Sequence, residues 1–221
     1  MTAINNSLLF EQLTPDNAAM LLVDHQVGTM SFGLTDIDAV NLKNNTLWLA
    51  GAAKAFKLPT ILTTSNPNGA NGPLFPELIA ALPDAPIIDR VIINAWNDPA
   101  FVDAVKKTGR KKLIIAGVTA DVCLTFPAVS AAGEGYDVYA VMDASGTVNQ
   151  HAMYAAMFRM SQAGVKIANT NMVIAELQAD WTKPTAAEIG GLYANRLPNF
   201  GYIAAHLDYT AKQLQKAGTG A

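Results

Sequence analysis

The segment Lys111–Tyr136, KKLIIAGVTADVCLTFPAVSAAGEGY, decides the fold expected for the chain. Its apolar run from Leu113 to Gly117 predicts a buried parallel strand, because strands covered on both faces carry continuous apolar runs. A short turn follows, and a helix rich in small residues is expected from about Leu124 to Glu134, where glycines end it. The single cysteine of the chain, Cys123, therefore lies at a strand-to-helix junction.

The position of Cys123 has two interpretations. At a helix N-terminus, unpaired N–H groups and the positive end of the dipole lower the pKa of a thiol and supply donors for an oxyanion. A lone cysteine is also commonly a buried small apolar residue. The spacing alone leaves both interpretations open, and residues elsewhere in the chain must decide between them.

Strand-like and helix-like segments alternate along the rest of the chain. Apolar runs predict strands at 18–23, 59–64, 137–142 and 165–168, and a short strand or extended segment at 87–93. Helical spacing predicts helices at 38–56, 99–108, 149–163, 172–178 and about 186–194, and a glycine-, proline- and asparagine-rich loop is expected at 65–78. This alternation predicts an α/β fold of three layers around a mostly parallel sheet of about six strands.

Length and composition indicate one globular domain. The 221 residues are 51% hydrophobic, and no linker or internal repeat divides them. We expect a single domain over 1–221, with an N-terminal arm at 1–17. The segment from about 196 to 221 is expected to be a C-terminal appendage that can serve as an oligomer contact.

Charge and hydropathy exclude several classes of partner. The net charge is −3, and the densest basic cluster, from Lys106 to Lys112, joins a helix end to a strand start, where cations favour the helix dipole. No nucleic-acid surface is therefore expected. The sequence contains no run of about 18 apolar residues, so no membrane span is expected. The N-terminus lacks the pattern of a secretory signal. One cysteine fits a reducing compartment, so we expect a cytoplasmic protein.

Polar side chains follow three of the expected strands. They are Asp24-His25-Gln26, the turn from Thr119 to Cys123, and Asp143-Ala144-Ser145. Parallel strands bring their carboxyl ends to one edge of a sheet, and ligands bind at that edge. Asp24 and Cys123 can therefore meet although they lie far apart in the sequence.

A nucleophilic thiol needs a proton acceptor, a nearby positive charge and donors for an oxyanion. Asp24 can accept the proton, Arg90 can supply the charge, and the backbone N–H groups of Thr119 and Cys123 can be the donors. Alternatives stay open. Asp24 can instead be a strand-end carboxylate that a helix N-terminus satisfies, and the sequence by itself favours Arg90 as a surface residue paired with a nearby aspartate such as Asp89.

Several motifs resemble those of the isochorismatase-like cysteine hydrolases, and most of all their YcaC-like subgroup. Asp24 follows AMLLV, Arg90 shortly precedes IINAW, and Cys123 lies in AGVTADVCLTFPAVSAAGEGYDVYAVMDASGT. The resemblance extends from about Ala18 to Trp181. It implies the three-layer fold, and it implies hydrolysis of a C–N bond rather than vinyl-ether cleavage, because isochorismatase itself lacks the nucleophilic cysteine.

The resemblance also implies roles for individual residues. Asp24 is the expected proton shuttle, and Cys123 is the expected nucleophile that forms a thioester with an amide-type small molecule. Arg90 takes the position where the family usually has a lysine, which leaves it an electrostatic role. A cis peptide between Val118 and Thr119 is implied, and it would direct the amides of Thr119 and Cys123 into one oxyanion hole.

Weaker candidates surround this centre. Gln26, Asn94 and Trp96 can line a substrate pocket, although Trp96 fits core or subunit packing equally well. His25 lies beside Asp24, but no D-x-H spacing supplies further metal ligands, and no glycine motif for a nucleotide follows a strand. We therefore expect neither a metal nor a cofactor.

Two other interpretations keep the fold but change the function. The chain can be a catalytically decayed oligomeric scaffold, which the intact Asp24 and Cys123 argue against and the arginine mildly favours. It can also be a thiol sensor, although a single cysteine excludes disulfide cycling within one chain. The expected partners are a small-molecule substrate and further copies of the chain, in a tetramer or an octamer.

Overall fold

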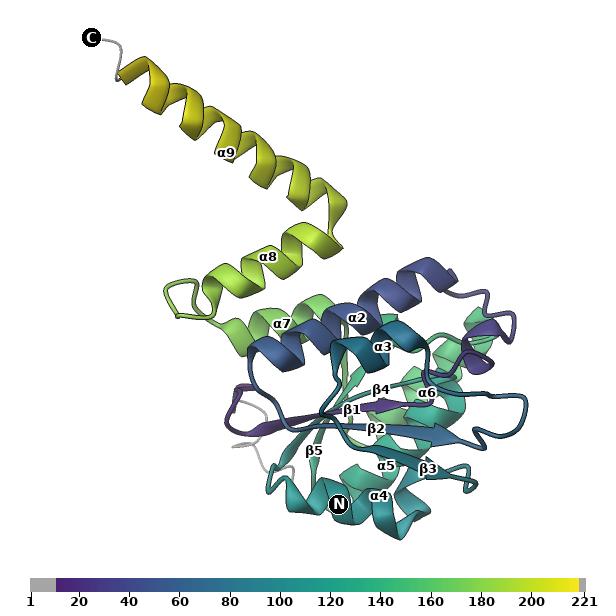
Figure 1. Cartoon of the computed structure of the whole chain (residues 1–221). Coiled ribbons are helices and arrows are strands. Elements are labelled where there is room, and N and C mark those ends of the chain that lie inside the picture. The colour runs from purple at the N-terminus through teal and green to yellow at the C-terminus, as the bar shows by residue number, and fades with distance from the viewer. Residues whose placement is uncertain (1–10, 219–221) are drawn as a thin grey trace. The chain divides into compact units, whose positions relative to one another are not determined.

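The fold is built on one parallel sheet. The computed structural model describes residues 11–218. Its strands are β1 (Ala18–Val23), β2 (Thr60–Ser65), β3 (Ile87–Arg90), β4 (Lys112–Gly117), β5 (Asp137–Val141) and β6 (Lys166–Ala168). They lie in the order β3-β2-β1-β4-β5-β6, and all neighbouring pairs are parallel (Figure 1). The expected α/β architecture with a six-stranded parallel sheet is confirmed.

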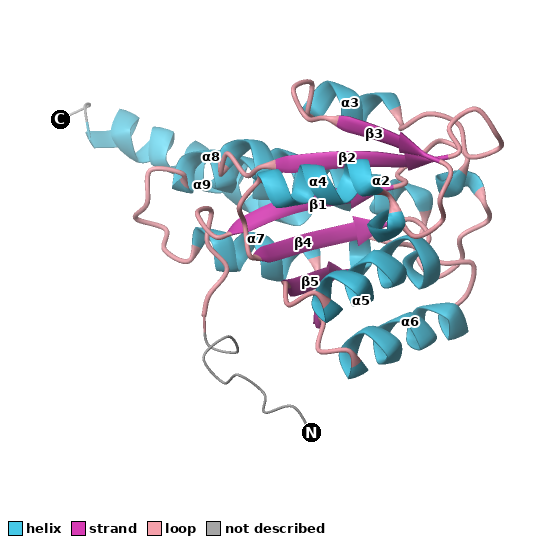
Figure 2. Ribbon diagram, turned by 90° about the horizontal axis from the view of Figure 1, so that it is seen from below, coloured by secondary structure: helices cyan, strands magenta, loops and turns pink. Residues whose placement is uncertain are grey.

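Helices cover both faces of this sheet. One face carries α4 (Pro99–Lys107), α5 (Thr125–Gly133) and α6 (Gln150–Gln162), which lie in front in Figure 2. The other face carries α2 (Ala39–Ala55), α3 (Pro76–Ala81) and α7 (Thr170–Gln178) (Figure 1). Short helical turns follow several strands: η1 (Thr29–Ser31), η2 (Ala95–Asn97), η3 (Ala120–Leu124) and η4 (Met142–Ala144).

Local sequence signals explain where some helices begin. Asp98 accepts hydrogen bonds from the amides of Ala100 (2.9 Å) and Phe101 (3.1 Å), and Pro99 takes the first helical position of α4. This cap is the one predicted from the sequence, because a proline at that position loses no hydrogen bond. Gly109, with φ of 67°, follows the end of the helix as predicted.

Two local expectations are wrong. The predicted loop at 65–78 contains the start of α3, because Pro76 occupies the first helical position and Glu77 favours the N-terminal dipole. Strand β3 ends at Arg90 instead of continuing to 93, because the guanidinium of Arg90 binds the carbonyl groups of Ile92 and Ile93. Those carbonyl groups are then unavailable to a sheet.

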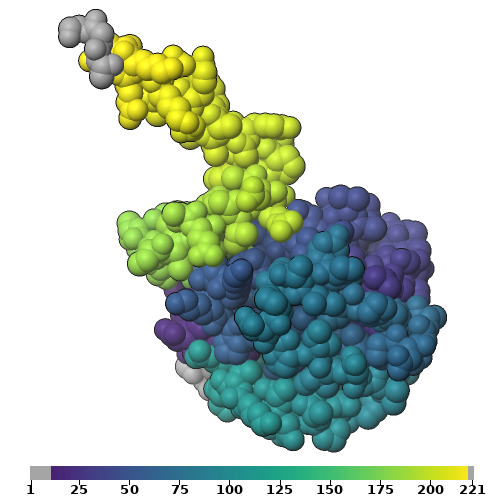
Figure 3. Space-filling view, viewed as in Figure 1, coloured from purple at the N-terminus to yellow at the C-terminus, as the bar shows by residue number. Residues whose placement is uncertain are grey.

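The chain separates into two compact units, one ending at Ala179 and one beginning at Asp180. The second unit contains α8 (Ala186–Arg196) and α9 (Pro198–Gly218), the yellow-green and yellow surface of Figure 3. The segment from about 196 was predicted only as an appendage, without secondary structure. In the structure, 21 of its residues form helix α9. Residues 1–10 of the expected N-terminal arm lie outside the described residues, and the single domain over 1–221 stays a prediction.

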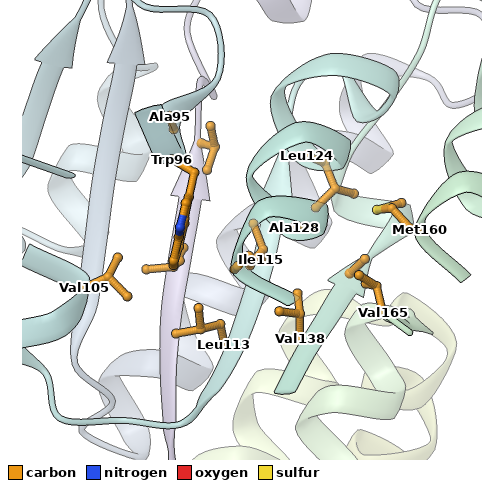
Figure 4. Packing of buried hydrophobic residues seen from close by; sticks show 14 of the residues in the cluster. Ala95, Trp96, Val105, Leu113, Ile115, Leu124, Ala128, Val138, Met160 and Val165 are labelled. Carbon is orange, nitrogen blue, oxygen red and sulfur yellow. The ribbon is translucent and has the colours of Figure 1, made fainter. Parts of the chain in front are cut away.

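An apolar core lies between the sheet and helices α4 to α6. Ile115 and Val138 of the sheet face the helical segment that carries Leu124 and Ala128 (Figure 4). Small residues along α5 allow the helix to lie close to the sheet, and burial of this apolar surface is the main stabilising contribution. Among the described helices, none combines the length and apolarity needed to cross a bilayer.

Candidate active site

The candidate site lies where the strand order reverses. β1 and β4 are neighbours in the sheet, although β2 and β3 separate them in the sequence. In open parallel sheets, ligands bind at such a switch point, beyond the carboxyl ends of the strands. Asp24 directly follows β1, and Cys123 lies in η3 after β4. The topology therefore brings both residues to one edge of the sheet.

Asp24 and Arg90 form a buried ion pair. Nη2 of Arg90 donates to Oδ2 of Asp24 at 2.6 Å, and the exposed fraction of both side chains is 0%. Nη1 of Arg90 donates to the carbonyl oxygens of Ile92 and Ile93, the latter at 2.9 Å. The interpretation of Arg90 as a surface residue paired with Asp89 is wrong. Side chains alternate along β3, so Arg90 points inward while Asp89 is exposed.

The carboxylate of Asp24 is only partly satisfied. Its backbone has φ of 59°, in the left-handed region that aspartate tolerates better than most residues. Its carbonyl oxygen accepts a hydrogen bond from Oγ1 of Thr29 at 2.5 Å. Oδ1 is buried and has no conventional hydrogen-bond partner among residues 11–218. Burial raises the pKa of Asp24, while the charge of Arg90 and the thiol of Cys123 oppose that rise.

The thiol of Cys123 contacts this carboxylate and is held in its protonated form. Burial raises the pKa of Cys123 well above 9.0, and the neighbouring charge of Asp24 raises it further. Arg90 and a backbone hydrogen bond from Thr119 act in the opposite direction but do not prevail. The expectation that the helix N-terminus lowers the pKa of this thiol is therefore wrong. A partly buried thiol beside a carboxylate needs a base at the moment of attack, and Asp24 is in contact with it.

The segment after β5 holds the cysteine turn in place. Oγ of Ser145 accepts a hydrogen bond from the amide of Gly117 at 2.9 Å and donates to the carbonyl of Val141 at 2.7 Å. The carbonyl of Gly146 accepts from the amide of Ala120 at 3.0 Å. The sequence marked this segment only as a polar strand end. Its role as a support for the turn needed the order of the strands to be known.

Gly117 allows the cysteine turn to approach β4. A Cβ atom at this position would lie 2.9 Å from the backbone carbon and oxygen of Cys123 and from the amide nitrogen of Leu124. Atoms of a real side chain do not approach that closely, so any larger residue would displace the turn. Gly117 was predicted only as the end of a strand, and its spacing to Cys123 was the available signal of this contact.

The backbone donors near the sulfur are not equivalent. The peptide bond between Val118 and Thr119 is cis. The amide of Thr119 interacts with the thiol of Cys123. The amide of Cys123 already donates to the carbonyl of Thr119 at 2.8 Å, so an oxyanion would have to share this donor. The two amides expected to form one oxyanion hole are therefore close together, but one of them is engaged.

Two of the three weaker pocket candidates have other contacts. Oε1 of Gln26 accepts from the amide of Ser65 at 2.8 Å, and its Nε2 donates to the carbonyl of Ser65 at 3.2 Å and to that of Gly72. Gln26 thus joins the loops after β1 and β2. Trp96 lies in the apolar core (Figure 4), and its Nε1 donates to Glu134 at 2.9 Å. Trp96 is therefore a packing residue, which was one of its two sequence interpretations.

Asn94 is the candidate that borders a cavity. The cavity has a volume of about 450 Å³ and is also lined by residues of the loop after β3, of α5 and of α6. Nδ2 of Asn94 donates to Oγ of Ser130 at 3.1 Å, and its Oδ1 accepts from the amide of Trp96 at 3.0 Å. Asn94 therefore fixes the loop after Arg90 against α5, the helix that follows Cys123.

His25 is a neutral, buried residue. Its Nε2 donates to the carbonyl of Ala144 at 2.9 Å, and burial lowers its pKa to about 4. Its Nδ1 has no hydrogen-bond partner in the described part of the chain. No group of three histidine, cysteine, aspartate or glutamate residues within 11–218 is arranged to hold a metal ion. His25 thus links the end of β1 to η4.

Comparisons with known proteins identify similar sequences and structures. The family model described as the Isochorismatase domain matches residues 18–172. The probable hydrolase YcaC of Escherichia coli (strain K12) is 47% identical over 205 residues, which are 92% of this chain and 98% of that protein. A similar solved structure is the crystal structure of the E. coli YcaC gene product, described as an octameric hydrolase of unknown specificity. Its TM-score is 0.88, and the two sequences are 48% identical over 91% of this chain and 98% of that one.

A second solved structure is similar to the same extent. It is YcaC from Pseudomonas aeruginosa with hexane-2,5-diol and covalent acrylamide. Its TM-score is 0.87, with 46% identity over 90% of this chain and 98% of that one. Each of the two comparisons covers at least 90% of this chain.

Proposed function

Since the chain belongs to the isochorismatase family and is a hydrolase, we propose that it cleaves an amide-type C–N bond of a small molecule through a thioester on Cys123. The observation that carries this proposal is the contact between the Cys123 thiol and a buried carboxylate, Asp24, that Arg90 holds in place. In this arrangement Cys123 is the nucleophile, Asp24 moves the proton, and Arg90 supplies a fixed positive charge.

In the first half of the reaction, the sulfur of Cys123 attacks the carbonyl carbon while Asp24 takes the thiol proton. Burial disfavours the charged form of both groups, and the charge of Arg90 offsets this penalty whichever of them is ionised. The oxyanion of the tetrahedral intermediate accepts from the amide of Thr119 and shares the amide of Cys123. Asp24 then protonates the leaving amine or ammonia as the C–N bond breaks, which leaves the thioester.

In the second half, water hydrolyses the thioester. Asp24 takes a proton from the water, hydroxide adds to the thioester carbonyl, and the acid leaves as the C–S bond breaks. The proton on Asp24 returns to the sulfur. Arg90 stays protonated throughout, because a guanidinium does not lose its proton in a protein. Arg90 therefore positions Asp24 and supplies a fixed charge. The lysine that is usual in the family could also exchange a proton.

The covalent acrylamide in the P. aeruginosa relative supports a nucleophile of this kind. Acrylamide adds to a thiol by forming a C–S bond without losing a leaving group, and Cys123 is the single cysteine of this chain. The raised pKa of Cys123 disfavours a thiol sensor, because sensor cysteines depend on an accessible thiolate. The complete set of Asp24, Arg90 and Cys123 disfavours a decayed scaffold.

Intact-protein mass spectrometry with a panel of small amides tests this function. We expect one amide to add an acyl group to the wild-type protein and to release its amine, and Cys123→Ala to gain no mass. Thr108→Ala is the matched control and should acylate like wild type, because Thr108 follows α4 and its hydroxyl donates to the carbonyl of Val105, away from Asp24, Arg90 and Cys123. Full turnover of a hydrolysed amide by Cys123→Ala would refute the proposal.

We also propose that the chain works as a cytoplasmic homo-oligomer, a tetramer or an octamer, as expected from the sequence. The octameric E. coli relative supports this. So do the large apolar residues that the first unit exposes, such as Val91, Ile93 and Phe158. Light scattering after size-exclusion chromatography should give a mass that is four or eight times the 23.4 kDa of the chain.

A further inference from the structure

Helix α9 lacks the packing that a helix of its composition needs. None of its 21 residues is buried within the described chain. Five large side chains of α9 are more than half exposed: Tyr202, Ile203, Leu207, Tyr209 and Leu214. Helix α9 contacts the region of α8 through its first turn, where the rings of Tyr193 and Phe200 lie 5.8 Å apart and the amide of Gly201 donates to the carbonyl of Leu197. Helices in water gain most of their stability from a packed face, so α9 needs a partner.

The exposed residues of α9 form a heptad stripe. Six residues recur at alternating spacings of three and four, as in positions a and d of a coiled coil: Phe200, Ile203, Leu207, Thr210, Leu214 and Ala217. Tyr202 and Tyr209 fall on the opposite side of the helix. The positions beside the stripe, Ala204, His206, Ala211 and Gln213, carry no acidic or permanently charged group. Two such helices can therefore approach closely without charge repulsion.

We propose that α9 pairs with α9 of a second copy of this chain, as an antiparallel coiled coil. When the two-fold axis passes between positions 208 and 209, each stripe residue of one helix faces a stripe residue of the other. The facing pairs are Phe200 with Ala217, Ile203 with Leu214, and Leu207 with Thr210, and the symmetry makes each pair occur twice. Two of these pairs join a large side chain to a small one, which allows even packing between the helices. This inference rests on the oligomer proposed above and names one of its contacts.

Charge favours a second copy in this orientation. The cations Lys212 and Lys216 lie in the C-terminal half of α9, and the one acidic residue, Asp208, lies at its centre. A parallel pair would bring four lysines to one end. An antiparallel pair separates them and places each helix C-terminus beside the N-terminus of the other, where the dipoles attract. The octameric relative, which the comparison covers over 98% of its chain, supports self-association of this fold.

Two substitutions on opposite sides of α9 test the contact. Leu207→Glu places a charge in the stripe, and Tyr209→Glu places the same charge on the outer side of the helix. Light scattering should show that Leu207→Glu halves the mass of the assembly, while Tyr209→Glu leaves it at the wild-type value. An unchanged mass for Leu207→Glu, or equal dissociation of both variants, would overturn the α9 contact. A monomeric wild-type protein would overturn the proposed oligomer as well.

Cysteine cross-linking tests the orientation without depending on folding of a charged variant. In a Cys123→Ser background, the double variant Ile203→Cys/Leu214→Cys should form disulfide-linked dimers on mild oxidation. Each single variant should stay unlinked, because identical positions lie far apart along an antiparallel pair. Dimers from Ile203→Cys alone would overturn the antiparallel arrangement, and absence of dimers from the double variant would overturn the pairing of α9 helices.

Discussion

At the residue scale, the chemistry depends on one carboxylate whose two oxygens differ. Oδ2 of Asp24 binds Arg90, while Oδ1 is buried without a conventional partner in the described chain, and the carboxylate contacts the thiol of Cys123. Asp24→Asn keeps the shape of the side chain but removes the base. We expect kcat to fall by at least about 100-fold, as for loss of a general base.

A second, partly buried aspartate provides the control for this prediction. Asp143 caps α7 by accepting from the amide and hydroxyl of Thr170 at 2.7 and 2.8 Å. Asp143→Asn should lower the stability and leave kcat close to the wild-type value. An Asp24→Asn enzyme that is as active as Asp143→Asn would exclude Asp24 as the proton shuttle.

Arg90 should matter for stability as well as for catalysis. Arg90→Met leaves the buried carboxylate of Asp24 unpaired, and we expect a loss of about 3–5 kcal/mol in the free energy of unfolding. Arg90→Lys restores the residue usual in the family and keeps a positive charge, although it loses the contact with the carbonyl of Ile93. Urea denaturation should therefore rank wild type above Arg90→Lys and Arg90→Lys above Arg90→Met. Equal stability of the two variants would contradict the buried ion pair.

The lowered pKa of His25 predicts how the stability of the protein depends on pH. Its pKa is about 4 in the native protein, against 6.5 for an unperturbed histidine, because burial disfavours its charged form. Below pH 6.5 the unfolded chain binds a proton that the native protein does not, so stability is full above 6.5 and falls as the pH approaches 4. The loss amounts to about 3 kcal/mol. Urea denaturation at pH 7.5 and 5 should show a smaller decrease for His25→Asn than for wild type, and equal decreases would contradict this assignment.

At the element scale, the junction of β4 and η3 decides where the sulfur lies. Gly117→Ala should displace the backbone of Cys123, because the added Cβ would lie 2.9 Å from it. We expect a loss of activity larger than the loss of stability. Gly133→Ala is the matched control, since a Cβ at Gly133 meets nothing within 4 Å. Thermal unfolding and turnover of both variants check this, and a fully active Gly117→Ala enzyme would contradict the close approach.

The helices and strands show which parts of the fold can be predicted from the sequence. Apolar runs such as Ala18–Val23 are local signals, and they predicted the strands to within a residue or two, apart from the C-terminal end of β3. The turn before α5 was predicted, but its π-helical form, η3, was not, because such a turn has no sequence signature. Helix α3 was missed because Pro76 was counted as a loop residue. The pKa of Cys123 was predicted with the wrong sign, since it depends on burial and on Asp24 and not on the helix N-terminus alone.

At the scale of the whole molecule, the site exists only because of the strand order. Asp24, Arg90 and Cys123 follow or end β1, β3 and β4, and the strand order places β1 beside β4 and separates β1 from β3 by β2 alone. Parallel topology predicted that Asp24 and Cys123 can meet. The place of Arg90 in the site was implied by the family resemblance and not by its local sequence, and its ion pair with Asp24 was not predicted. Thr29, which binds the Asp24 carbonyl, had no signal at all, because a hydroxyl contact of this kind leaves no pattern in the chain.

The contact between Asp24 and Cys123 is tested most directly by the pH dependence of Cys123 alkylation with acrylamide, followed by intact mass. For the wild-type protein, the rate should keep rising above pH 9, because burial and the charge of Asp24 hold the pKa of the thiol well above 9.0. Asp24→Asn should shift this titration to lower pH, since it removes a neighbouring negative charge. An ordinary thiol titration that Asp24→Asn leaves unchanged would contradict the pairing of carboxylate and thiol.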